Sequence, residues 1–373
     1  MKLYAILLTM TFWVLLNYHF CVFDTPPKIR NKPTQIKKTE NSPAHAPHTS
    51  SLQQTCQHTQ GKIGILIVAD SGAQQSYRPA IRSVQCYGAK HEYPVIVIDP
   101  NNATQVPADC NRYNRIMFKR HCIALQLIAQ FDWIAGFDGD VGVVSSAKCL
   151  ESLIKPGIDV VHEERFHNGE VQAGSYLIKN SDFGRQYLRE WTEYEHALPS
   201  GFHNEDNGAL HIHLLKNIAG NDTSIVDKCY AMWTQSVDLD SYDRYVGCCM
   251  QYISDARFHN KSPSKIRIIR RGQGFMRDLW VTRNLASPVD FFLHAMKDHV
   301  KFYDEQNESM DLCGTPAWMP MILPGKLIST TEMQAVITEA DNTAKTTRPA
   351  SIVNAALVSH CWPNCREYWN IIT

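Results

Sequence analysis

The stretch Trp133-Ile-Ala-Gly-Phe-Asp-Gly-Asp-Val-Gly-Val-Val144 decides which fold the sequence predicts. It opens with five apolar or small residues, typical of a strand that is covered on both faces. Two aspartates follow directly, where a buried strand would end. In an open parallel sheet, ligands bind beyond the carboxyl ends of the strands, so Asp138 and Asp140 fall at a binding edge.

Apolar patterns on both sides of this stretch extend it into an α/β unit. Upstream, two continuous aliphatic runs lie about thirty residues apart with room for a helix between them, which is the spacing of a β-α-β unit. Apolar residues at three-and-four spacing predict helices before and after the stretch. We therefore predict a mostly parallel, doubly wound sheet. The predicted strands are 63–68, 95–98, 133–137, 141–144 and 171–179, and the predicted helices are 78–90, 115–131 and 187–198.

The chain divides into four parts by composition. Residues 1–23 end in a run of 21 nearly all apolar residues, Leu3 to Phe23, which as a helix spans about 31 Å and predicts a transmembrane signal-anchor rather than a cleaved signal peptide. Residues 24–60 are rich in Pro, Lys, Thr and Ser and predict a disordered stem. Residues 61–300 hold the predicted catalytic domain, and 301–373 form a tail or subdomain without a clear period.

Two features give opposite indications of the side of the membrane on which the domain lies. Lysines and an arginine in residues 28–38 outnumber the charge before the apolar run, which by the positive-inside rule indicates a cytoplasmic domain. Twelve cysteines and four Asn-x-Ser/Thr sequons favour an oxidising lumen. We predict a single-pass type II protein of the Golgi or endoplasmic reticulum membrane with a luminal domain. The sequons are at Asn102, Asn221, Asn260 and Asn307.

The charge balance argues against nucleic acid as a partner, and the pattern of cysteines argues against a zinc site. Lys plus Arg equals Asp plus Glu at 37 each, so no basic field exists to hold nucleic acid. Eleven cysteines follow the apolar run, an odd number, so one is left over if the others pair. The segment His360-Cys-Trp-Pro-Asn-Cys365 lacks a fourth zinc ligand at the usual spacing, which favours a disulfide or a thiol there.

The pair Asp138 and Asp140 has the chemistry of a metal site. Residues two apart in an extended segment point to the same side, so both carboxylates can reach one Mn²⁺ or Mg²⁺ ion, which prefers oxygen ligands. A turn that closes the strand is the alternative. The similar pair Asp238 and Asp240 shows that the pattern also arises by chance, and we interpret that pair as surface residues.

Three further polar residues are candidates with open alternatives. His294 follows an apolar run and is either a third metal ligand or a packed core histidine, and Lys297 lies where it would reach a phosphate. Glu205 and Asp206 are adjacent carboxylates that otherwise fit a solvated loop or helix cap.

Five segments in this order resemble the glycosyltransferase-like family called domain of unknown function 273, which is similar in turn to the galactosyl- and mannosyltransferases of glycosyltransferase family 34. The resemblance covers roughly residues 61–300. The segments are WIAGFDGDVGVV, EVQAGSYLIKNSD, FHNEDNGALH, GQGFMRDLW and FFLHAMK.

This resemblance implies a GT-A fold, that is, a nucleotide-diphospho-sugar transferase fold, and transfer with retention of configuration. By position, Asp138, Asp140 and His294 match the metal ligands, and Asp206 and Glu205 match the catalytic acidic pair. The implied donor is a UDP-sugar, with galactose favoured, and the acceptor is a glycan, glycoprotein or glycolipid. Gly139 departs from the alanine common in relatives. The implied donor contacts are Asp70, Asp138, Asp140, Gly174 and Lys297.

Two other functions remain open at this point. A luminal binding protein could keep the GT-A fold without turnover, and titration with UDP and Mn²⁺ would separate binding from none. A metal-dependent hydrolase could use the same aspartates, but the chain lacks the additional His and Asp clusters of a two-metal site.

Overall fold

The computed structural model describes residues 55–220, 222–258, 265–304, 312–347 and 358–365. The expected anchor, most of the expected stem and the sequons at Asn221, Asn260 and Asn307 lie outside these residues. None of the helices in the described ranges combines the length and apolarity needed to cross a bilayer.

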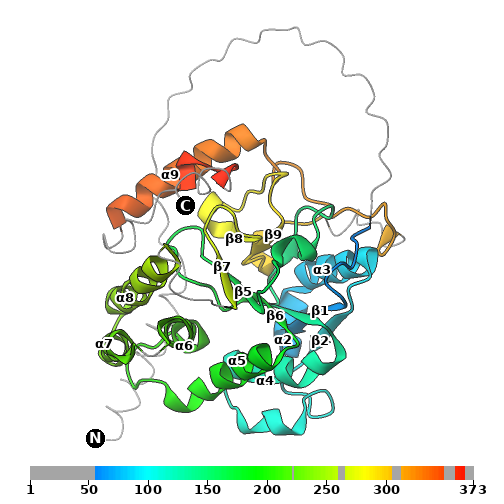
Figure 1. The fold of residues 1–373 in the computed structure, drawn as a ribbon. Helices are drawn as coiled ribbons and strands as arrows, with labels where there is room; N and C mark the ends of the chain where they lie inside the picture. The colour runs from blue at the N-terminus through cyan, green and yellow to red at the C-terminus, as the bar shows by residue number, and fades with distance from the viewer. Residues whose placement is uncertain (1–54, 221, 259–264, 305–311, 348–357, 366–373) are drawn as a thin grey trace, which may run out of the picture. The chain divides into compact units, whose positions relative to one another are not determined.

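The described chain is a mixed α/β fold with a parallel-rich sheet (Figure 1). The main sheet has the strand order β2-β1-β3-β6-β5-β7, and a second sheet has the order β4-β9-β8. The strands are β1 Ile63–Val68, β2 Val95–Ile98, β3 Trp133–Phe137, β4 Gly142–Val143, β5 Val160–Glu163, β6 Ser175–Lys179, β7 Ile266–Ile269, β8 Met276–Asp278 and β9 Phe292–His294. The α-helices are α2 Ser71–Ser76, α3 Arg78–His91, α4 Ile116–Leu127, α5 Asp182–Glu193, α6 Glu205–Ala219, α7 Thr223–Thr234, α8 Leu239–Phe258 and α9 Thr330–Thr347.

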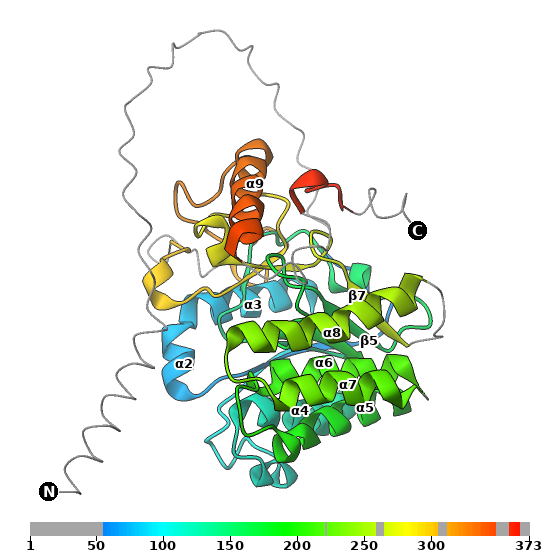
Figure 2. The ribbon, with the colours of Figure 1, turned by 90° about the vertical axis from the view of Figure 1, so that its left-hand side faces the viewer.

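The central strands are apolar throughout because both faces of the main sheet are covered. Leu66 of β1 and Ile134 of β3 pack with buried residues of α4 to α8, which Figure 2 shows gathered on one side of the sheet. Ile65 and Ile67 belong to the opposite face, where they pack with α3 and the second sheet. The continuous aliphatic pattern of strands 63–68 and 133–137 follows from this double burial.

Strand β6 departs from the predicted parallel order. It runs antiparallel to both β3 and β5, whereas β1 is parallel to β2 and β3, and β5 is parallel to β7. Only residues 164–174 connect β5 to β6, which is too short for the crossover that parallel neighbours need. The sheet is therefore parallel-rich with one reversed strand.

The predicted strand at 141–144 also lies elsewhere than expected. It is shortened to β4, and it pairs antiparallel with β9 in the second sheet rather than continuing the main one. Residues 138–141 thus carry the chain from one sheet to the other, and this transition places the two aspartates at the junction.

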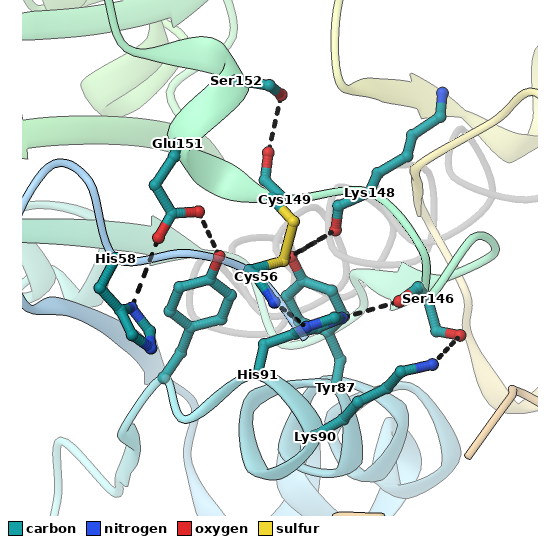
Figure 3. Close-up of a disulfide and its surroundings, with 11 residues drawn as sticks. Cys56, His58, Tyr87, Lys90, His91, Ser146, Lys148, Cys149, Glu151 and Ser152 are labelled. Atoms are coloured by element: carbon teal, nitrogen blue, oxygen red, sulfur yellow. Dashed lines mark hydrogen bonds and ion pairs between the residues drawn. A yellow bond between two sulfur atoms is a disulfide. The ribbon is translucent and has the colours of Figure 1, made fainter. Parts of the chain in front are cut away.

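A disulfide ties the N-terminal end of the described chain to the folded unit. Cys56 pairs with Cys149, so residues 55–60 of the expected stem are attached to the folded unit (Figure 3). The Cys56 N–H donates to Nδ1 of buried His91 at 3.1 Å, and Nε2 of that ring donates to the Ser146 carbonyl at 2.7 Å. This arrangement needs a neutral ring, and burial lowers the pKa of His91 accordingly.

The described parts of the segment 301–373, residues 301–304, 312–347 and 358–365, belong to the same unit. Cys313 pairs with Cys86 of α3, and helix α9 packs against the 3₁₀ helix η5, Leu279–Thr282. Cys361 and Cys365 form a disulfide. The sequence favours a disulfide or a thiol over a zinc site at this position. Among the described cysteines, buried Cys249 alone has no disulfide partner. The remaining pairs are Cys110–Cys122 and Cys229–Cys248.

Candidate metal and donor site

Three residues predicted as metal ligands lie together where the two sheets meet. Asp138 follows β3, Asp140 lies two residues further on, and His294 ends β9. The His294 Nε2 is 3.6 Å from Asp138 Oδ2 and 3.3 Å from Asp140 Oδ1. One ligand atom from each residue lies within 4.8 Å of the other two, so the three could hold one metal ion.

A buried carboxylate fixes the orientation of the histidine. Asp278, at the end of β8, is 2% exposed, and its Oδ1 lies 2.8 Å from His294 Nδ1. With Nδ1 engaged as a donor, Nε2 faces the two aspartates, which is the usual support of a metal-binding histidine. Burial disfavours charge on Asp278, but Arg165, at 2.8 Å, holds its pKa well below the usual range.

Burial and neighbouring charges together set the protonation of Asp140 and His294, which face each other. Burial raises the pKa of Asp140, Asp138 adds to this, and His294 opposes it. Burial lowers the pKa of His294, but Asp140 and Asp278 raise it above its ordinary value. Without a cation, the site thus holds a proton on the imidazole more strongly than a solvated histidine does.

A second group of charges contacts Asp138 through the carboxylate oxygen that does not face His294. Arg120 of α4 pairs with Asp138 Oδ1 and, at 2.6 Å, with Asp206 Oδ2, while Asp138 Oδ2 faces His294. Although burial opposes the charge, the two carboxylates raise the pKa of Arg120. His121 Nε2 lies 2.9 Å from Asp206, and burial lowers the pKa of His121 to about 4.

The predicted acidic pair is divided between two environments. Asp206, 3% exposed in the first turn of α6, belongs to the Arg120 group just described; burial acts to raise its pKa, but Arg120 and His121 keep it lowered. Glu205 pairs with Arg115, and its side chain is 36% exposed. Asp206 and Asp138 are therefore bridged by a single side chain, that of Arg120.

Two glycines allow the close packing around Asp138. The Gly174 carbonyl accepts from the Asp138 N–H at 2.8 Å, and a Cβ on Gly174 would stand 2.2 Å from Asp138 Oδ2. A Cβ on Gly139 would lie 3.1 Å from the Tyr77 ring and 3.2 Å from the Ala69 Cβ. Gly174 therefore leaves the space that the Asp138 carboxylate occupies.

A cavity of about 500 Å³ is lined by residues that follow His294 in the chain, although none of the three candidate ligands lines it. Met296, whose N–H donates to the Asp140 carbonyl at 2.9 Å, and Lys297 contribute to its lining just after His294. Arg78, at the start of α3, and Lys301 add two more cations to its wall. Asp70 precedes helix α2 and caps its N-terminus: its carboxylate accepts from the Ala73 N–H at 2.8 Å.

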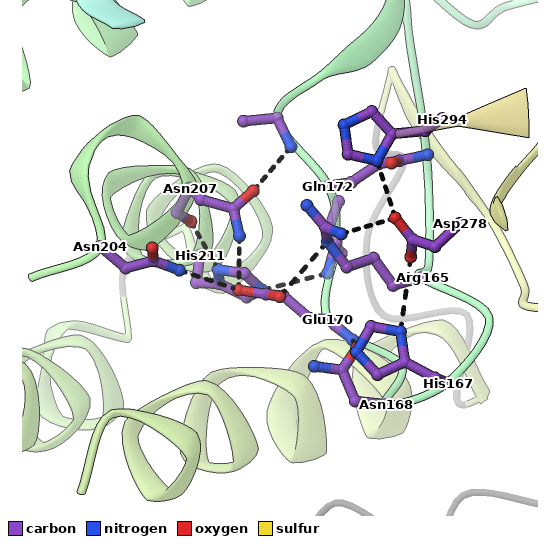
Figure 4. Close-up of polar contacts among 12 residues, drawn as sticks. Arg165, His167, Asn168, Glu170, Gln172, Asn204, Asn207, His211, Asp278 and His294 are labelled. Carbon is purple, nitrogen blue, oxygen red and sulfur yellow. Dashed lines mark hydrogen bonds and ion pairs between the residues drawn. The ribbon is translucent and has the colours of Figure 1, made fainter. Parts of the chain in front are cut away.

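A polar network connects the site to helix α6 (Figure 4). Arg165, which pairs with Asp278, also lies 3.4 Å from Glu170 Oε2. The other oxygen of Glu170 accepts from Asn207 of α6, whose side-chain oxygen in turn accepts from the Ala173 N–H at 2.8 Å. The segments quoted above as EVQAGSYLIKNSD, FHNEDNGALH, GQGFMRDLW and FFLHAMK thus converge on one site.

Three site residues, Arg120, Arg165 and Asp278, were not predicted from the sequence. Arg120 lies on an amphipathic helix, where an arginine normally indicates the solvent face. Asp278 ends a strand of three residues, which is too short to give a periodic signal, although it lies within the quoted segment GQGFMRDLW.

The chain belongs to the family described as "Protein of unknown function, DUF273", whose model matches residues 84–310. This confirms the family that the sequence motifs resemble. No curated protein matches the chain. The fold is similar to the crystal structure of a glycosyltransferase involved in the glycosylation of the major capsid of PBCV-1, at 14% identity and a TM-score of 0.34, over 63% of this chain and 92% of the other. A similarity this distant gives no conclusion about activity.

Proposed function

We propose that the chain is a metal-dependent glycosyltransferase of the GT-A type that transfers a hexose, with galactose the first candidate, from a nucleoside diphosphate sugar to a glycan. One observation carries the proposal. Asp138 and Asp140, from one stretch of the sequence, and His294, from a distant one, have ligand atoms within 4.8 Å of one another, and Met296 and Lys297, which follow His294, line a cavity of about 500 Å³.

The three side chains suit a divalent cation by their chemistry. Two carboxylates and one neutral imidazole fit Mn²⁺, and Mg²⁺ is the second choice because it prefers oxygen ligands alone. Such an ion supplies Lewis-acid stabilisation of a diphosphate leaving group. The residues of the chain position it: Asp278 holds the His294 ring, and Gly174 leaves room for the Asp138 carboxylate.

The neighbouring cavity fits the anionic part of the donor. Lys297, Arg78 and Lys301 bring three positive charges to its wall against one carboxylate, Asp304, and this excess of positive charge can neutralise phosphate oxygens without favouring a particular base. We propose UDP as the nucleotide. Asp70 caps α2, whose last residues Gln75 and Ser76 line the cavity, and we propose that it supports this wall.

We propose that transfer proceeds with retention. The acceptor hydroxyl attacks on the face that the phosphate leaves, and the departing phosphate oxygen takes the hydroxyl proton, so no separate base from the chain is needed. Asp206 is the first candidate for stabilising positive charge on the sugar, because Arg120 pairs with both Asp206 and Asp138. The same ion pairs hold Asp138 in place. Exposed Glu205 serves as the second candidate for stabilising positive charge on the sugar.

We propose that the enzyme works in the lumen of the Golgi or endoplasmic reticulum as a type II membrane protein. Five disulfides support an oxidising compartment. The sequon residue Asn102 is exposed, and its side chain accepts from the Thr104 hydroxyl at 2.7 Å within the sequon. The acceptor is then a glycan on a glycoprotein or glycolipid.

A panel of nucleotide-sugars tests the activity with the full-length protein in detergent. We expect Mn²⁺-dependent nucleotide release from at least one donor, abolished by EDTA and by Asp140→Ala. Asp240→Ala is the matched control, because Asp240 belongs to an exposed pair of the same spacing. Release that is unchanged in Asp140→Ala would reject the site, and binding of UDP with Mn²⁺ without any release would favour a luminal binding protein.

A further inference from the structure

A second cavity, of about 280 Å³, lies between helix α9, the 3₁₀ helix η5 and residues 166–167. One part of its wall is apolar, and Trp280 is the largest side chain there. The rest is polar or charged. This volume lies just below that of typical ligand pockets, which hold roughly 300–1,000 Å³, and it suits a single small ring. The apolar part of the wall includes Phe166 and Trp280, and the polar part includes His167, Arg283, Glu339 and Asp341.

Trp280 contributes a partly exposed aromatic ring to the cavity wall. It is 46% exposed although it is among the largest apolar side chains of the chain. Its ring stands against the His167 ring with centroids 4.5 Å apart and an angle of 65° between the planes. The negative face of an indole attracts polarised C–H bonds, such as those on the face of a pyranose ring.

The cavity wall carries two carboxylates, Glu339 and Asp341, and one guanidinium, Arg283, which disfavours an anionic ligand. Arg283 pairs with Glu339 across the cavity wall. Asp341 is 8% exposed and accepts from the Ser359 N–H at 2.7 Å. Carboxylates and a guanidinium with remaining hydrogen-bonding capacity can bind neighbouring hydroxyl groups, whereas a phosphate or a carboxylate ligand would meet acidic side chains.

The cavity is connected to the candidate metal site through one carboxylate. His167 Nδ1 lies 3.4 Å from Asp278 Oδ2, and the other oxygen of Asp278 lies 2.8 Å from His294 Nδ1. Figure 4 shows the two histidines on opposite sides of Asp278. Asp278 therefore connects His167, in the wall of the cavity, to the candidate metal ligand His294.

We propose that this cavity binds a hexose unit of the glycan acceptor, a unit other than the one that receives the transferred sugar. Trp280 packs on the face of the ring, and Glu339 and Arg283 bind its hydroxyls. That the bound sugar belongs to an acceptor rests on the proposed transferase function. Sugar binding itself needs neither donor nor metal. The enzyme then selects oligosaccharides over monosaccharides.

Saturation-transfer NMR on the full-length protein tests the binding, with methyl glycosides of galactose, glucose, mannose and N-acetylglucosamine as probes, in EDTA. We expect binding of at least one of them. Trp280→Ala should weaken it about tenfold, and Trp280→Phe should retain most of it, because it keeps an aromatic face. Phe202→Ala, which removes an exposed aromatic ring elsewhere, is the matched control.

The outcomes separate this inference from the proposed function. Binding that is lost in Trp280→Ala but kept in Asp140→Ala supports a sugar subsite whether or not nucleotide is released in the donor panel. Glu339→Gln provides a second variant in case Trp280→Ala does not fold, and it should also weaken binding. If no methyl glycoside binds, or if Trp280→Ala and Glu339→Gln bind as the unaltered protein does, the inference is overturned.

Discussion

Replacing Gly174 by alanine changes one atom next to a proposed metal ligand. The added Cβ would stand 2.2 Å from Asp138 Oδ2 and 2.9 Å from its Cγ. Contacts below 3.0 Å are essentially never seen for a Cβ, so the oxygen must move by at least about 0.8 Å. This is the oxygen that faces His294.

The displacement should impair metal binding more than folding. Overpacking of this kind costs about 1–3 kcal/mol of stability. A ligand misplaced by this amount should reduce Mn²⁺ affinity about 10–100-fold, the range found when the support of a metal ligand is removed. In transfer assays the loss should be at least as large, because misplacement by about 1 Å costs on the order of a hundredfold in rate.

Titration of Mn²⁺, followed by the electron paramagnetic resonance signal of the free ion, measures the affinity, and thermal unfolding measures stability. Gly157→Ala is the matched control: it strains a residue with φ +80° but meets no atom within 4 Å, so it should lose about 1–2 kcal/mol and keep its Mn²⁺ affinity. Equal Mn²⁺ affinity in Gly174→Ala and the unaltered protein would refute this account of Asp138.

Three further results are expected. Asp278→Asn, which weakens the hold on His294, should lower Mn²⁺ affinity about 10–100-fold in the same titration, and an unchanged affinity would contradict the role of Asp278. Burial lowers the pKa of His162 to about 3, so below pH 6.5 the unfolded chain takes up a proton that the folded chain does not. The free energy of unfolding should therefore fall as pH drops from 6.5 toward 3, and His162→Gln should remove about 1.4 kcal/mol per pH unit from that slope in urea unfolding; a slope that His162→Gln leaves unaltered would contradict this. Removing the disulfide between Cys86 and Cys313 in the double serine variant should cost about 2–4 kcal/mol in the same assay, whereas equal stability would show that residues 312–347 are held without it.

The buried strands were predictable because their composition and their environment agree. The runs at 63–68 and 133–137 are β1 and β3 with the same bounds, and the helical pattern from 115 corresponds to α4. Their double burial requires an unbroken apolar sequence, which is easy to recognise. The position of Asp138 and Asp140 at the strand end followed from that strand.

Features that depend on distant contacts were not predictable. Strand β6 is reversed because its connection to β5 is short, a constraint that acts on pairing and leaves composition unchanged. Helix α9 is rich in threonine and polar residues, and it is positioned by contacts with η5 and the segment around Val358. Arg120 faces inward because Asp138 and Asp206 lie there, and neither is near it in the sequence.

The position of a bound metal ion tests the central claim most directly. Crystals of the protein grown with Mn²⁺ and UDP should give one strong anomalous scattering peak in contact with Asp138, Asp140 and His294, with diphosphate density extending toward Lys297. An ion bound elsewhere, or no ion at these three side chains at saturating Mn²⁺, would contradict the account.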